Sequence, residues 1–442
     1  MYSRIVVLGA GYVGITLSVA LCATGIRVLV VDIDEKKIDR LKKGDPCIRE
    51  DGLQELLKKH IDTSCIDFIS GDASVAAIDA DLLFICLPTD VDISGKPQLD
   101  TLINAAHTAS EYMASGGSLV VKSTVLPETT FKIAKSIGRR DLNVLVCPEF
   151  LQEGTALRDT LNPDRIVIGA DNFQAASDLA EILPKNENTE VIITDPTSAE
   201  LAKMISNTML ASKVTFANLV ADIAELTGAN SHDVLLAVGA DKRIGNTHLR
   251  PGPGWGGSCL PKDTQMLSYL TQSIGMPSQF VDSIYSENID HIERVANRIL
   301  DLMPQKGSEK LAILGVTFKG GTDDLRRSPA IEVINAVSKK VPNINIYDPS
   351  LSSNSAISDF ESLVDQRKIS IKEDAYKCVE SADLAVVLTD WEEFKTLDLA
   401  LVKAVMGTPV IYDTRNVIDE RVASEIGIEL IKLGTQNPKR FS

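Results

Sequence analysis

The sequence predicts an α/β protein in which two Rossmann-like, doubly wound domains are joined by a long central helix and a helical core. Strand-like apolar runs alternate with helix-compatible segments up to about residue 190, which predicts a parallel, doubly wound sheet, and the alternation returns at Leu311. Between these stretches, residues 198–227 contain neither Gly nor Pro, a pattern typical of one long helix. We therefore predict domains at 1–196, 197–305 and 306–442.

The composition is that of an ordinary folded protein. The chain has 442 residues, enough for two to four domains at roughly 100–200 residues each. Lys and Arg number 45 against 61 Asp and Glu, which gives a formal net charge of −16. Such a charge repels nucleic-acid phosphates and anionic lipids. We expect neither as a partner, and any anionic ligand must be met by local cations.

Several absences from the sequence narrow the class of protein. No apolar stretch reaches the roughly 18–20 residues of a membrane span, and no leader precedes the first strand-like run. The seven cysteines are scattered and without CxxC pairs, which is typical of free thiols in a reducing cytoplasm. The five histidines show no ligand spacing. We therefore expect a cytoplasmic protein without a metal site.

The first domain opens with a strand, a glycine-rich turn, a helix and a second strand. Residues 4–8 are a β-branched run, typical of a strand buried on both faces. Residues 12–24 have helix-compatible spacing, and Gly25 can end that helix. The other strands predicted here are 27–31, 82–87, 118–121 and 143–147.

The central segment begins with the predicted long helix. Thr197 and Glu200 have the spacing of a capping box, and Gly228 is a typical helix stop. Thirty residues at about 1.5 Å each give a helix of about 45 Å. We expect it to join two domains and to use its apolar face as a dimer surface. A short helix, the Gly/Pro-rich loop 251–257 and further helical sequence over about 262–302 follow.

The last domain repeats the architecture of the first but not its sequence. Its predicted strands are 311–316, 344–347, 384–388 and 409–412. The turn after the first of them, residues 316–321, lacks the GxGxxG pattern. We therefore predict that this domain binds a ligand other than a dinucleotide.

Gly9, Gly11 and Gly14, with Asp32, predict a dinucleotide site. The glycines allow a tight turn, a close approach of backbone to pyrophosphate, and close packing of helix on strand. Asp32 ends the second strand, where a carboxylate accepts from both ribose hydroxyls and repels the 2′-phosphate of NADP. We expect NAD as the cofactor. The alternative is a tight turn with a structural role only.

Cys259 lies between a glycine-rich loop and the next predicted helix. Four glycines within residues 252–257 let the backbone approach a ligand, and Pro261 suits the first turn of a helix. A helix N-terminus and Lys262 both favour the nucleophilic thiolate, and Asp263 can relay a proton. The alternative is a buried, inert thiol, which is our interpretation of the other six cysteines.

Further polar residues are candidates for the same chemistry. Lys203 and Asn207 share one face of the long helix, where an ammonium and a carboxamide can stabilise an oxyanion. The alternative is that both side chains lie on a solvated face of the helix. Glu149 and Thr124 follow strands, at the edge where open α/β sheets bind ligands; the alternative for the glutamate is a solvated acidic loop.

Cations stand at strand ends in the last domain. Lys319 and Arg415 are placed to hold a nucleotide diphosphate or a sugar, although most Lys and Arg side chains are simply solvated. The polar segment 322–326 lies near the first of them in the sequence.

Taken together, these motifs resemble the UDP-glucose/GDP-mannose dehydrogenase family over nearly the whole chain. The matching segments are 9–14, 122–125, 148–154, 198–207, 254–263, 318–329 and 389–394. The resemblance implies an enzyme that oxidises the C6 alcohol of a nucleotide sugar to a carboxylate with two NAD molecules. It also implies capture of the aldehyde by a cysteine as a thiohemiacetal, a later thioester, and dimers or multiples of dimers.

The resemblance also implies roles for individual residues. Cys259 matches the nucleophile, with Lys203, Asn207 and Asp263 around it and Glu149, Glu153 and Thr124 as acid/base and water-positioning groups. The implied cofactor contacts beyond the glycines and Asp32 are Tyr12, Val13, Lys37, Thr89, Thr124, Glu153 and Arg326. The implied substrate contacts are Glu149, Phe150, Leu151, Glu153, Lys203, Asn207, Arg243, Arg250, Gly256, Phe318, Lys319 and Arg415. Arg243 can come from the neighbouring subunit in this family.

Two segments depart from the family pattern, and several alternatives stay open. Leu87–Asp90 differs in the cofactor-side loop, and Trp255 could trim the sugar pocket. The resemblance favours UDP-glucose, with GDP-mannose or a UDP-N-acetylhexosamine as alternatives. A competing interpretation is a two-electron hydroxyacid dehydrogenase, but such an enzyme needs neither Cys259 nor residues 311–430. A second alternative is a protein that binds nucleotide sugars without catalysis, but such a sensor needs no activated thiol.

Overall fold

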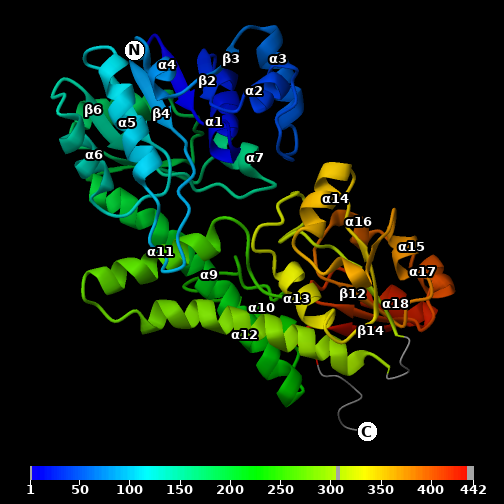
Figure 1. The fold of residues 1–442 in the computed structure, drawn as a ribbon. Coiled ribbons are helices and arrows are strands. Elements are labelled where there is room, and N and C mark those ends of the chain that lie inside the picture. Colours follow the sequence, from blue (N-terminus) through cyan, green and yellow to red (C-terminus); the bar gives the residue numbers. More distant parts are fainter. Residues whose placement is uncertain (1, 305–308, 436–442) are drawn as a thin grey trace. The chain divides into compact units, whose positions relative to one another are not determined.

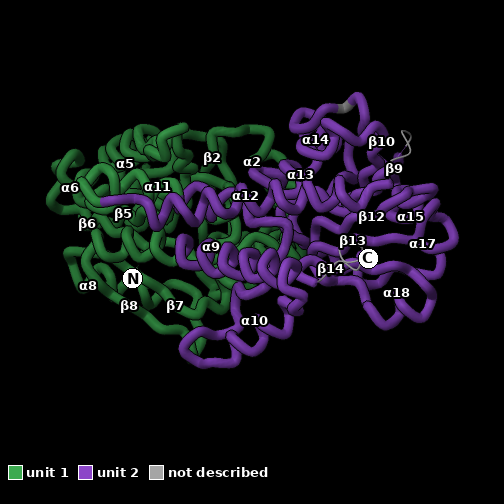
Figure 2. The backbone as a smooth tube through the Cα atoms, turned by 90° about the horizontal axis from the view of Figure 1, so that it is seen from below, with its two compact units in different colours: residues 1–206, 265–276 green, residues 207–264, 277–442 purple. Residues whose placement is uncertain are grey.

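The computed structural model describes residues 2–304 and 309–435 (Figure 1). The chain divides into two compact units, residues 1–206 with 265–276 and residues 207–264 with 277–442 (Figure 2). Each unit contains one β-sheet, and the chain passes between them along helix α9 (Pro196–Thr227). The predicted fold class is therefore confirmed. The three-domain boundaries stay a prediction.

The first unit is built on an eight-stranded sheet of order β3-β2-β1-β4-β5-β6-β7-β8. Its strands are β1 (Ile5–Leu8), β2 (Val28–Asp32), β3 (Ile66–Ser70), β4 (Leu82–Ile85), β5 (Ser118–Val121), β6 (Asn143–Val146), β7 (Arg165–Gly169) and β8 (Glu190–Thr194). Neighbours are parallel except β6 and β7, which are antiparallel. The expectation of a wholly parallel sheet was wrong here, because apolar runs carry no information on strand direction.

Helices cover both faces of this sheet. They are α1 (Tyr12–Ala23), α2 (Glu35–Lys42), α3 (Leu53–Asp62), α4 (Ala73–Ala77), α5 (Asp100–Tyr112), α6 (Thr129–Ile137), α7 (Ala156–Leu161) and α8 (Phe173–Ile182). Successive strand residues point to opposite faces. Val7 and Phe84 enter a core with α1, α3 and α8, whereas Val6 and Leu83 enter one with α4, α5 and α6.

Helix α9 begins differently from the prediction. Asp195 caps it, because its carboxylate accepts from the Ser198 N–H at 2.9 Å, and Pro196 occupies the first position, which proline favours. The predicted capping box of Thr197 and Glu200 was therefore wrong. The Glu200 carboxylate instead accepts from the Thr130 N–H and hydroxyl at 2.7 and 2.6 Å, and burial raises its pKa.

The second unit contains a six-stranded, fully parallel sheet of order β11-β10-β9-β12-β13-β14. Its strands are β9 (Lys310–Leu314), β10 (Asn343–Tyr347), β11 (Ile369–Ile371), β12 (Leu384–Val387), β13 (Val410–Asp413) and β14 (Glu429–Lys432). One face packs against α9, α12 (Gln279–Leu302), α13 (Pro329–Val337) and α14 (Asn354–Glu361). The other packs against α15 (Ala375–Val379), α16 (Glu392–Lys395), α17 (Leu399–Val405) and α18 (Glu420–Ile426).

Two shorter helices complete the central segment. They are α10 (Ser231–Gly239) and α11 (Leu260–Ser273). The helical stretch predicted over about 262–302 consists of two helices, α11 and α12, because Gly275 adopts φ +76° and Pro277 follows it.

The predicted strands are confirmed, with ends shifted by one or two residues. The missed strands are β3, β7, β8, β11 and β14. Several of these lack a long apolar run: β3 is exposed at three of five positions and β8 is buried at none.

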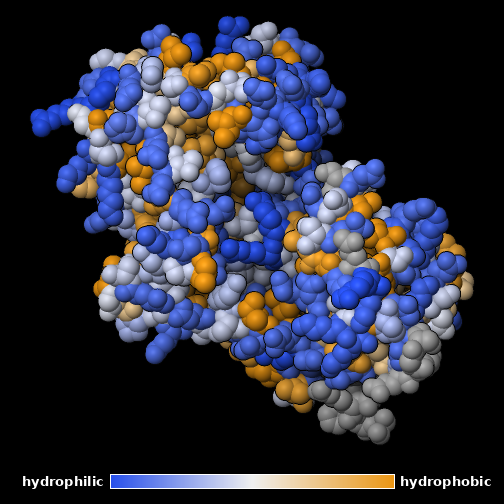
Figure 3. Space-filling view, in the orientation of Figure 1, coloured by the Kyte–Doolittle hydropathy of each residue, from blue (hydrophilic) through white to orange (hydrophobic). Residues whose placement is uncertain are grey.

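The surface is largely hydrophilic on the face drawn. Figure 3 shows hydrophilic side chains over most of one face, with apolar side chains in patches among them. In the part of the chain that the structure describes, no helix combines the length and hydropathy of a membrane span.

Candidate active site

The turn between β1 and α1 has the geometry of a phosphate-binding loop. A Cβ on Gly14 would lie 1.8 Å from the Gly9 carbonyl oxygen, and one on Gly9 would lie 2.5 Å from the Cys86 carbonyl oxygen. Gly11 has open space in front of it, with nothing within 4 Å of an added Cβ. The turn is therefore closed against protein on one side and open on the other, as a backbone that receives a pyrophosphate must be.

Asp32 lies beside this turn at the end of β2. Its carboxylate accepts from the Ala10 N–H at 2.8 Å, the Asp34 N–H at 3.0 Å and Lys37 Nζ at 3.1 Å. Burial alone would raise the pKa of Asp32, but these donors outweigh it and the pKa is lowered. An ionised acceptor next to the open turn fits the ribose of a dinucleotide. Tyr12 and Val13 are half-buried in the first turn of α1.

Replacing Asp32 tests which dinucleotide fits. Asp32→Gly removes the charge that would repel a 2′-phosphate and frees Lys37 to meet it. We expect kcat/KM with NADP, relative to that with NAD, to rise by about tenfold or more. Initial-rate measurements with both cofactors check this, with Asp34→Gly as the control. An unchanged ratio would contradict the assigned role.

Thr89 and Thr124 come together at the ends of β4 and β5. The Thr89 hydroxyl donates to the Thr124 carbonyl oxygen at 2.8 Å, and both residues are buried. The unusual segment Leu87–Asp90 is thus tied to the segment after β5. Glu153, in the loop after β6, is also buried.

Lys203 and Glu149 form a buried ion pair. Lys203 Nζ lies 3.0 Å from Glu149 Oε1, and the two side chains are 2% and 10% exposed. The same carboxylate accepts from the Leu151 N–H at 3.0 Å. The solvated alternatives considered for Lys203 and for Glu149 are therefore wrong. An ammonium and a carboxylate held in a dry place can bind a polar substrate group or move a proton.

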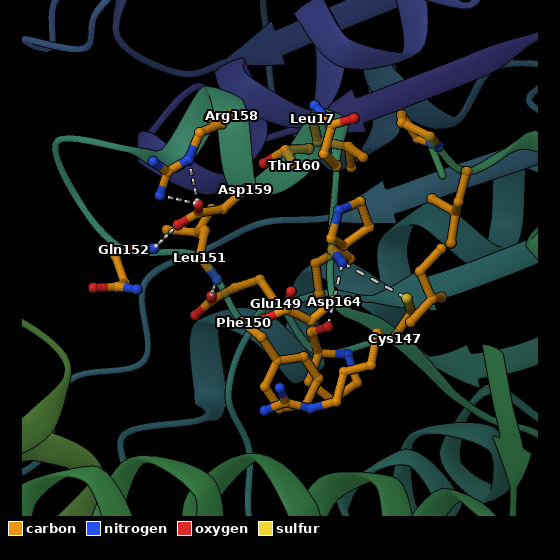
Figure 4. Close-up of a pocket in the computed structure, with 18 residues that line it drawn as sticks. Leu17, Cys147, Glu149, Phe150, Leu151, Gln152, Arg158, Asp159, Thr160 and Asp164 are labelled. Carbon is orange, nitrogen blue, oxygen red and sulfur yellow. Dashed lines mark hydrogen bonds and ion pairs between the residues drawn. The ribbon is translucent and has the colours of Figure 1, made fainter. Parts of the chain in front are cut away.

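Phe150 packs beside this pair and lines a cavity of about 350 Å³ (Figure 4). Its ring receives the Arg165 guanidinium at 4.0 Å and Lys203 Nζ at 5.4 Å from the centroid. Figure 4 shows Glu149, Phe150 and Leu151 along this cavity. The cation–π contacts fix the loop that carries three of the predicted substrate contacts.

Asn207 and Asp263 form a second buried pair, in the other unit. Asn207 Nδ2 donates to Asp263 Oδ2 at 2.6 Å, and Lys262 Nζ lies 2.7 Å from Asp263 Oδ1. Asp263 is 0% exposed. The carboxylate is held by an amide and an ammonium, which suits a group that accepts and returns a proton through water. The solvated alternative for Asn207 is wrong.

Cys259 stands at the N-terminal end of α11. Its carbonyl oxygen accepts from the Asp263 N–H at 2.9 Å, which makes it the residue that precedes the first helical turn. Its side chain is half-buried. The amide groups of a helix N-terminus stabilise negative charge, so this position favours a thiolate.

The loop before Cys259 packs tightly within its own unit. A Cβ on Gly256 would lie 2.0 Å from the Arg327 carbonyl oxygen, and one on Gly257 would lie 3.1 Å from the Phe318 ring. Phe318 follows β9, so the loop contacts the segment after β9, in the domain that the sequence assigns to substrate. Gly256 and Gly257 leave room for these neighbours, because a Cβ would come too close to the Arg327 backbone or to the Phe318 ring.

Trp255 does not trim a sugar pocket, contrary to the expectation. Its indole N–H donates to the Thr215 hydroxyl at 2.8 Å, and its backbone exchanges hydrogen bonds with the Asn288 carboxamide at 2.9 and 3.0 Å. It is 5% exposed in a small core with Ala211 and Ile284. Its indole and backbone hydrogen bonds attach the loop to α9 and α12.

The other cysteines are free and half-buried or buried. Burial raises the pKa of Cys86 to about 12 and also raises the pKa of Cys22, Cys47 and Cys378. These thiols are protonated at neutral pH and are poor nucleophiles.

Arg415 binds the segments around β9 and β12. Its guanidinium donates to the Phe318 carbonyl oxygen at 2.8 Å and to the Leu388 carbonyl oxygen at 2.9 Å. Asp390 lies in the same group and accepts from the Gly320 N–H at 2.9 Å. Burial would raise its pKa, but Arg415, the Gly320 N–H and Lys319 lower it. Lys319 is half-buried, with Nζ 5.9 Å from the Phe318 centroid.

Three predicted arginines lie in more open surroundings. Arg326 makes a two-point ion pair with Asp324 at 2.9 and 2.8 Å, and its side chain is 62% exposed. The Arg243 side chain is 88% exposed and pairs with Asp241. Arg250 is also exposed. Their assigned contacts stay predictions.

Comparison with known proteins places these features in one family. The family models for UDP-glucose/GDP-mannose dehydrogenases match the chain with their NAD binding domain at residues 3–186, central domain at 197–289 and UDP binding domain at 312–420. The chain belongs to this family. Its NAD binding domain makes it an NAD-dependent oxidoreductase by family, as the sequence predicted.

Individual relatives agree with this assignment. The chain is 34% identical over 419 residues to UDP-glucose 6-dehydrogenase TuaD of Bacillus subtilis, covering 93% of this chain and 89% of the relative. A UDP-glucose dehydrogenase structure from Pyrobaculum islandicum matches with TM-score 0.84 and 30% identity over 99% and 98% of the two chains. A UDP-D-ManNAc dehydrogenase structure from Pyrococcus horikoshii matches with TM-score 0.83 and 25% identity over 98% and 99%.

Sequence reasoning missed several residues that shape the site of this family member. Asp390 anchors the turn after β9, and Asp348 accepts from the Val316 N–H at 2.6 Å and the Trp391 indole N–H at 3.0 Å. Asp348 follows β10 as Asp32 ends β2, so an acid after an apolar run was the available signal. Arg165, which follows Asn162-Pro-Asp, had no such signal. Among residues 2–304 and 309–435, no cluster of three or more His, Cys, Asp or Glu is arranged to bind a metal ion.

Proposed function

We propose that this chain oxidises the C6 alcohol of UDP-glucose to the carboxylate of UDP-glucuronate, using two NAD molecules and a covalent intermediate on Cys259. The observation that carries the proposal is the position of Cys259: half-buried, at the start of α11, at the end of a glycine loop that packs on Phe318. A module that only binds nucleotide sugars needs no thiol in such a place. A two-electron hydroxyacid dehydrogenase needs neither this thiol nor the second sheet.

The dinucleotide fits the first unit. Gly9 and Gly14 close the turn, Gly11 leaves open space, and Asp32 is an ionised acceptor beside it. When bound there, NAD would accept one hydride in each of the two oxidations. The chain supplies the positioning and the proton transfers. In the first oxidation, Asp263, acting through a water, takes the proton of the C6 hydroxyl as the hydride leaves.

The second oxidation is proposed to run through sulfur. The Cys259 thiolate adds to the aldehyde carbon, and the new oxyanion is stabilised by Lys203 and Asn207 before it is protonated to a thiohemiacetal. Loss of a second hydride, with the hydroxyl proton passing to a base, leaves a thioester. Water, activated by Glu149 or Asp263, then attacks the thioester carbon, and the thiolate leaves with the uronate released.

UDP-glucose is proposed as the substrate because of the relatives. TuaD and the Pyrobaculum islandicum enzyme carry names of UDP-glucose dehydrogenases, and residues 312–420 match the UDP binding domain. Phe318, Lys319 and Arg415 lie in that domain and are the proposed contacts, with Arg415 fixed by two carbonyl oxygens. The Pyrococcus horikoshii structure makes UDP-N-acetylmannosamine the next candidate.

Counting NADH per sugar tests the proposal. UDP-glucose, UDP-N-acetylmannosamine and GDP-mannose would be supplied in limiting amounts with excess NAD, and NADH followed by absorbance. We expect two NADH per UDP-glucose and the lowest KM for that sugar. One NADH per sugar would support a two-electron dehydrogenase, and binding without NADH would support a silent sensor.

The assembly and the location belong to the same proposal. Several apolar side chains on α9 are exposed, among them Met209, Phe216, Ile223 and Leu226. We propose that they form a homodimer surface, to be tested by sedimentation of the wild-type chain. We also propose a cytoplasmic location, in keeping with seven free cysteines.

A further inference from the structure

A buried histidine outside the predicted site touches the loop that leads to Cys259. His291 of α12 is 0% exposed. Its Nδ1 lies 2.9 Å from Asp222 Oδ2 of α9, and its Nε2 lies 2.8 Å from the Gly252 carbonyl oxygen. Gly252 lies seven residues before Cys259. The ring therefore joins two helices and the start of the loop.

The partners determine the protonation of the ring. A peptide carbonyl only accepts, so Nε2 must carry a proton and donate to Gly252. Asp222 Oδ2 also accepts from Arg294 Nε at 2.8 Å, so this oxygen acts as an acceptor. The Nδ1 atom faces this carboxylate, so the two contacts fit a ring that donates from both nitrogens. Asp222 and Glu225 from α9 and Arg294 from α12 are the charged groups that face it.

Other contacts show that the loop is held by the same two helices. The Gly252 N–H donates to Asn218 Oδ1 of α9 at 2.9 Å. A Cβ on Gly254 would lie 2.6 Å from Ile292 of α12. The His291 side chain belongs to α12 and contacts both Asp222 of α9 and the Gly252 carbonyl, so one ring links the two helices and the loop.

The position of Gly252 affects more than the loop. A Cβ there would lie 2.9 Å from Arg415 Nη1, so the Gly252 backbone packs directly against the proposed substrate contact. A shift of the Gly252 carbonyl would thus disturb Arg415 on one side and the path toward Cys259 on the other. A displacement of this kind lowers turnover by misplacing reactive groups.

We propose that His291 is a positioning residue: as a two-donor imidazolium it ties the Gly252 carbonyl to Asp222 and fixes the loop that carries Cys259. The inference rests on the proposed function of that cysteine. The chemistry at the sugar remains with the residues named above, and the imidazolium acts through Gly252.

Two substitutions separate the two hydrogen bonds. The amide nitrogen of Gln reaches about as far as His Nε2, and that of Asn about as far as His Nδ1. His291→Gln can therefore keep the donor to Gly252, whereas His291→Asn keeps only the donor to Asp222. Both remove the ring and the charge, so they are matched for those losses.

We expect His291→Gln to retain kcat within about threefold and His291→Asn to lose about 10- to 100-fold, the range expected when a buried carbonyl is left without its donor. The KM for NAD should not change in either variant. His232→Asn, an exposed histidine on α10, is the control. Equal losses in both variants, or a kcat that simply follows the thermal midpoint, would overturn the proposal.

Two readouts do not depend on the thioester step. ¹⁵N NMR of the wild-type imidazole should show a proton on each nitrogen at neutral pH, and a single protonated nitrogen would overturn the assignment. The alkylation rate of Cys259 by iodoacetamide should change in His291→Asn and stay near wild type in His291→Gln. If the wild type yields one NADH per sugar, the proposed function fails, while the NMR and alkylation results still decide the role of His291.

Discussion

Cys259→Ser should abolish the formation of the uronate and reduce NADH to at most one per UDP-glucose. A serine hydroxyl is protonated at neutral pH and is a far weaker nucleophile than a thiolate at the N-terminus of α11. Without the thiohemiacetal, the second hydride cannot leave. We expect uronate production to fall by about 10³-fold or more. Product analysis by mass spectrometry, together with NADH absorbance under limiting sugar, measures both quantities.

Cys378→Ala is the matched control for that substitution. Cys378 belongs to the same unit, is fully buried, and has its pKa raised by burial. It should lose some stability and keep two NADH per sugar. Four-electron turnover by Cys259→Ser would remove the covalent step from the mechanism.

Lys203→Met should destabilise the protein and slow the second oxidation. The substitution keeps the length and apolar stem of the side chain but leaves the Glu149 carboxylate, 10% exposed, without its ammonium partner. Breaking a buried ion pair from one side costs about 3–5 kcal/mol in the free energy of unfolding. Loss of an oxyanion donor should lower kcat by about 10²- to 10³-fold. Urea unfolding and steady-state kinetics measure the two effects.

The double variant Lys203→Met with Glu149→Leu separates stability from catalysis. It removes both charges, so much of the unfolding free energy should return while activity stays low. Lys132→Met, which breaks the exposed pair with Glu128, should change stability by about 0.5 kcal/mol or less. A Lys203→Met variant as stable as this control would contradict the buried pair.

The sequence by itself determined the fold class, and it supplied the candidate residues of the proposed site. The apolar runs at 4–8 and 311–316, the glycine spacing before α1 and the Gly-free segment 198–227 are local patterns, which can be read directly from a linear chain. The same local signals were insufficient at β8, which is buried nowhere, and at α9, where Asp195 outcompeted Thr197 as the cap. They also said nothing of the antiparallel β6 and β7.

Only the tertiary structure decided which side chains are partners. Lys203 and Glu149 are 54 positions apart, and Asn207 and Asp263 are 56 apart, so each pair exists only after distant segments pack and water is excluded. Trp255 became an anchor for the same reason, since its indole N–H had to find the Thr215 hydroxyl once it was buried. In the sequence, His291 is one of five histidines without a distinguishing pattern, and the fold places two acceptors beside its ring. A one-dimensional pattern records which groups are present, and burial determines what each must bind.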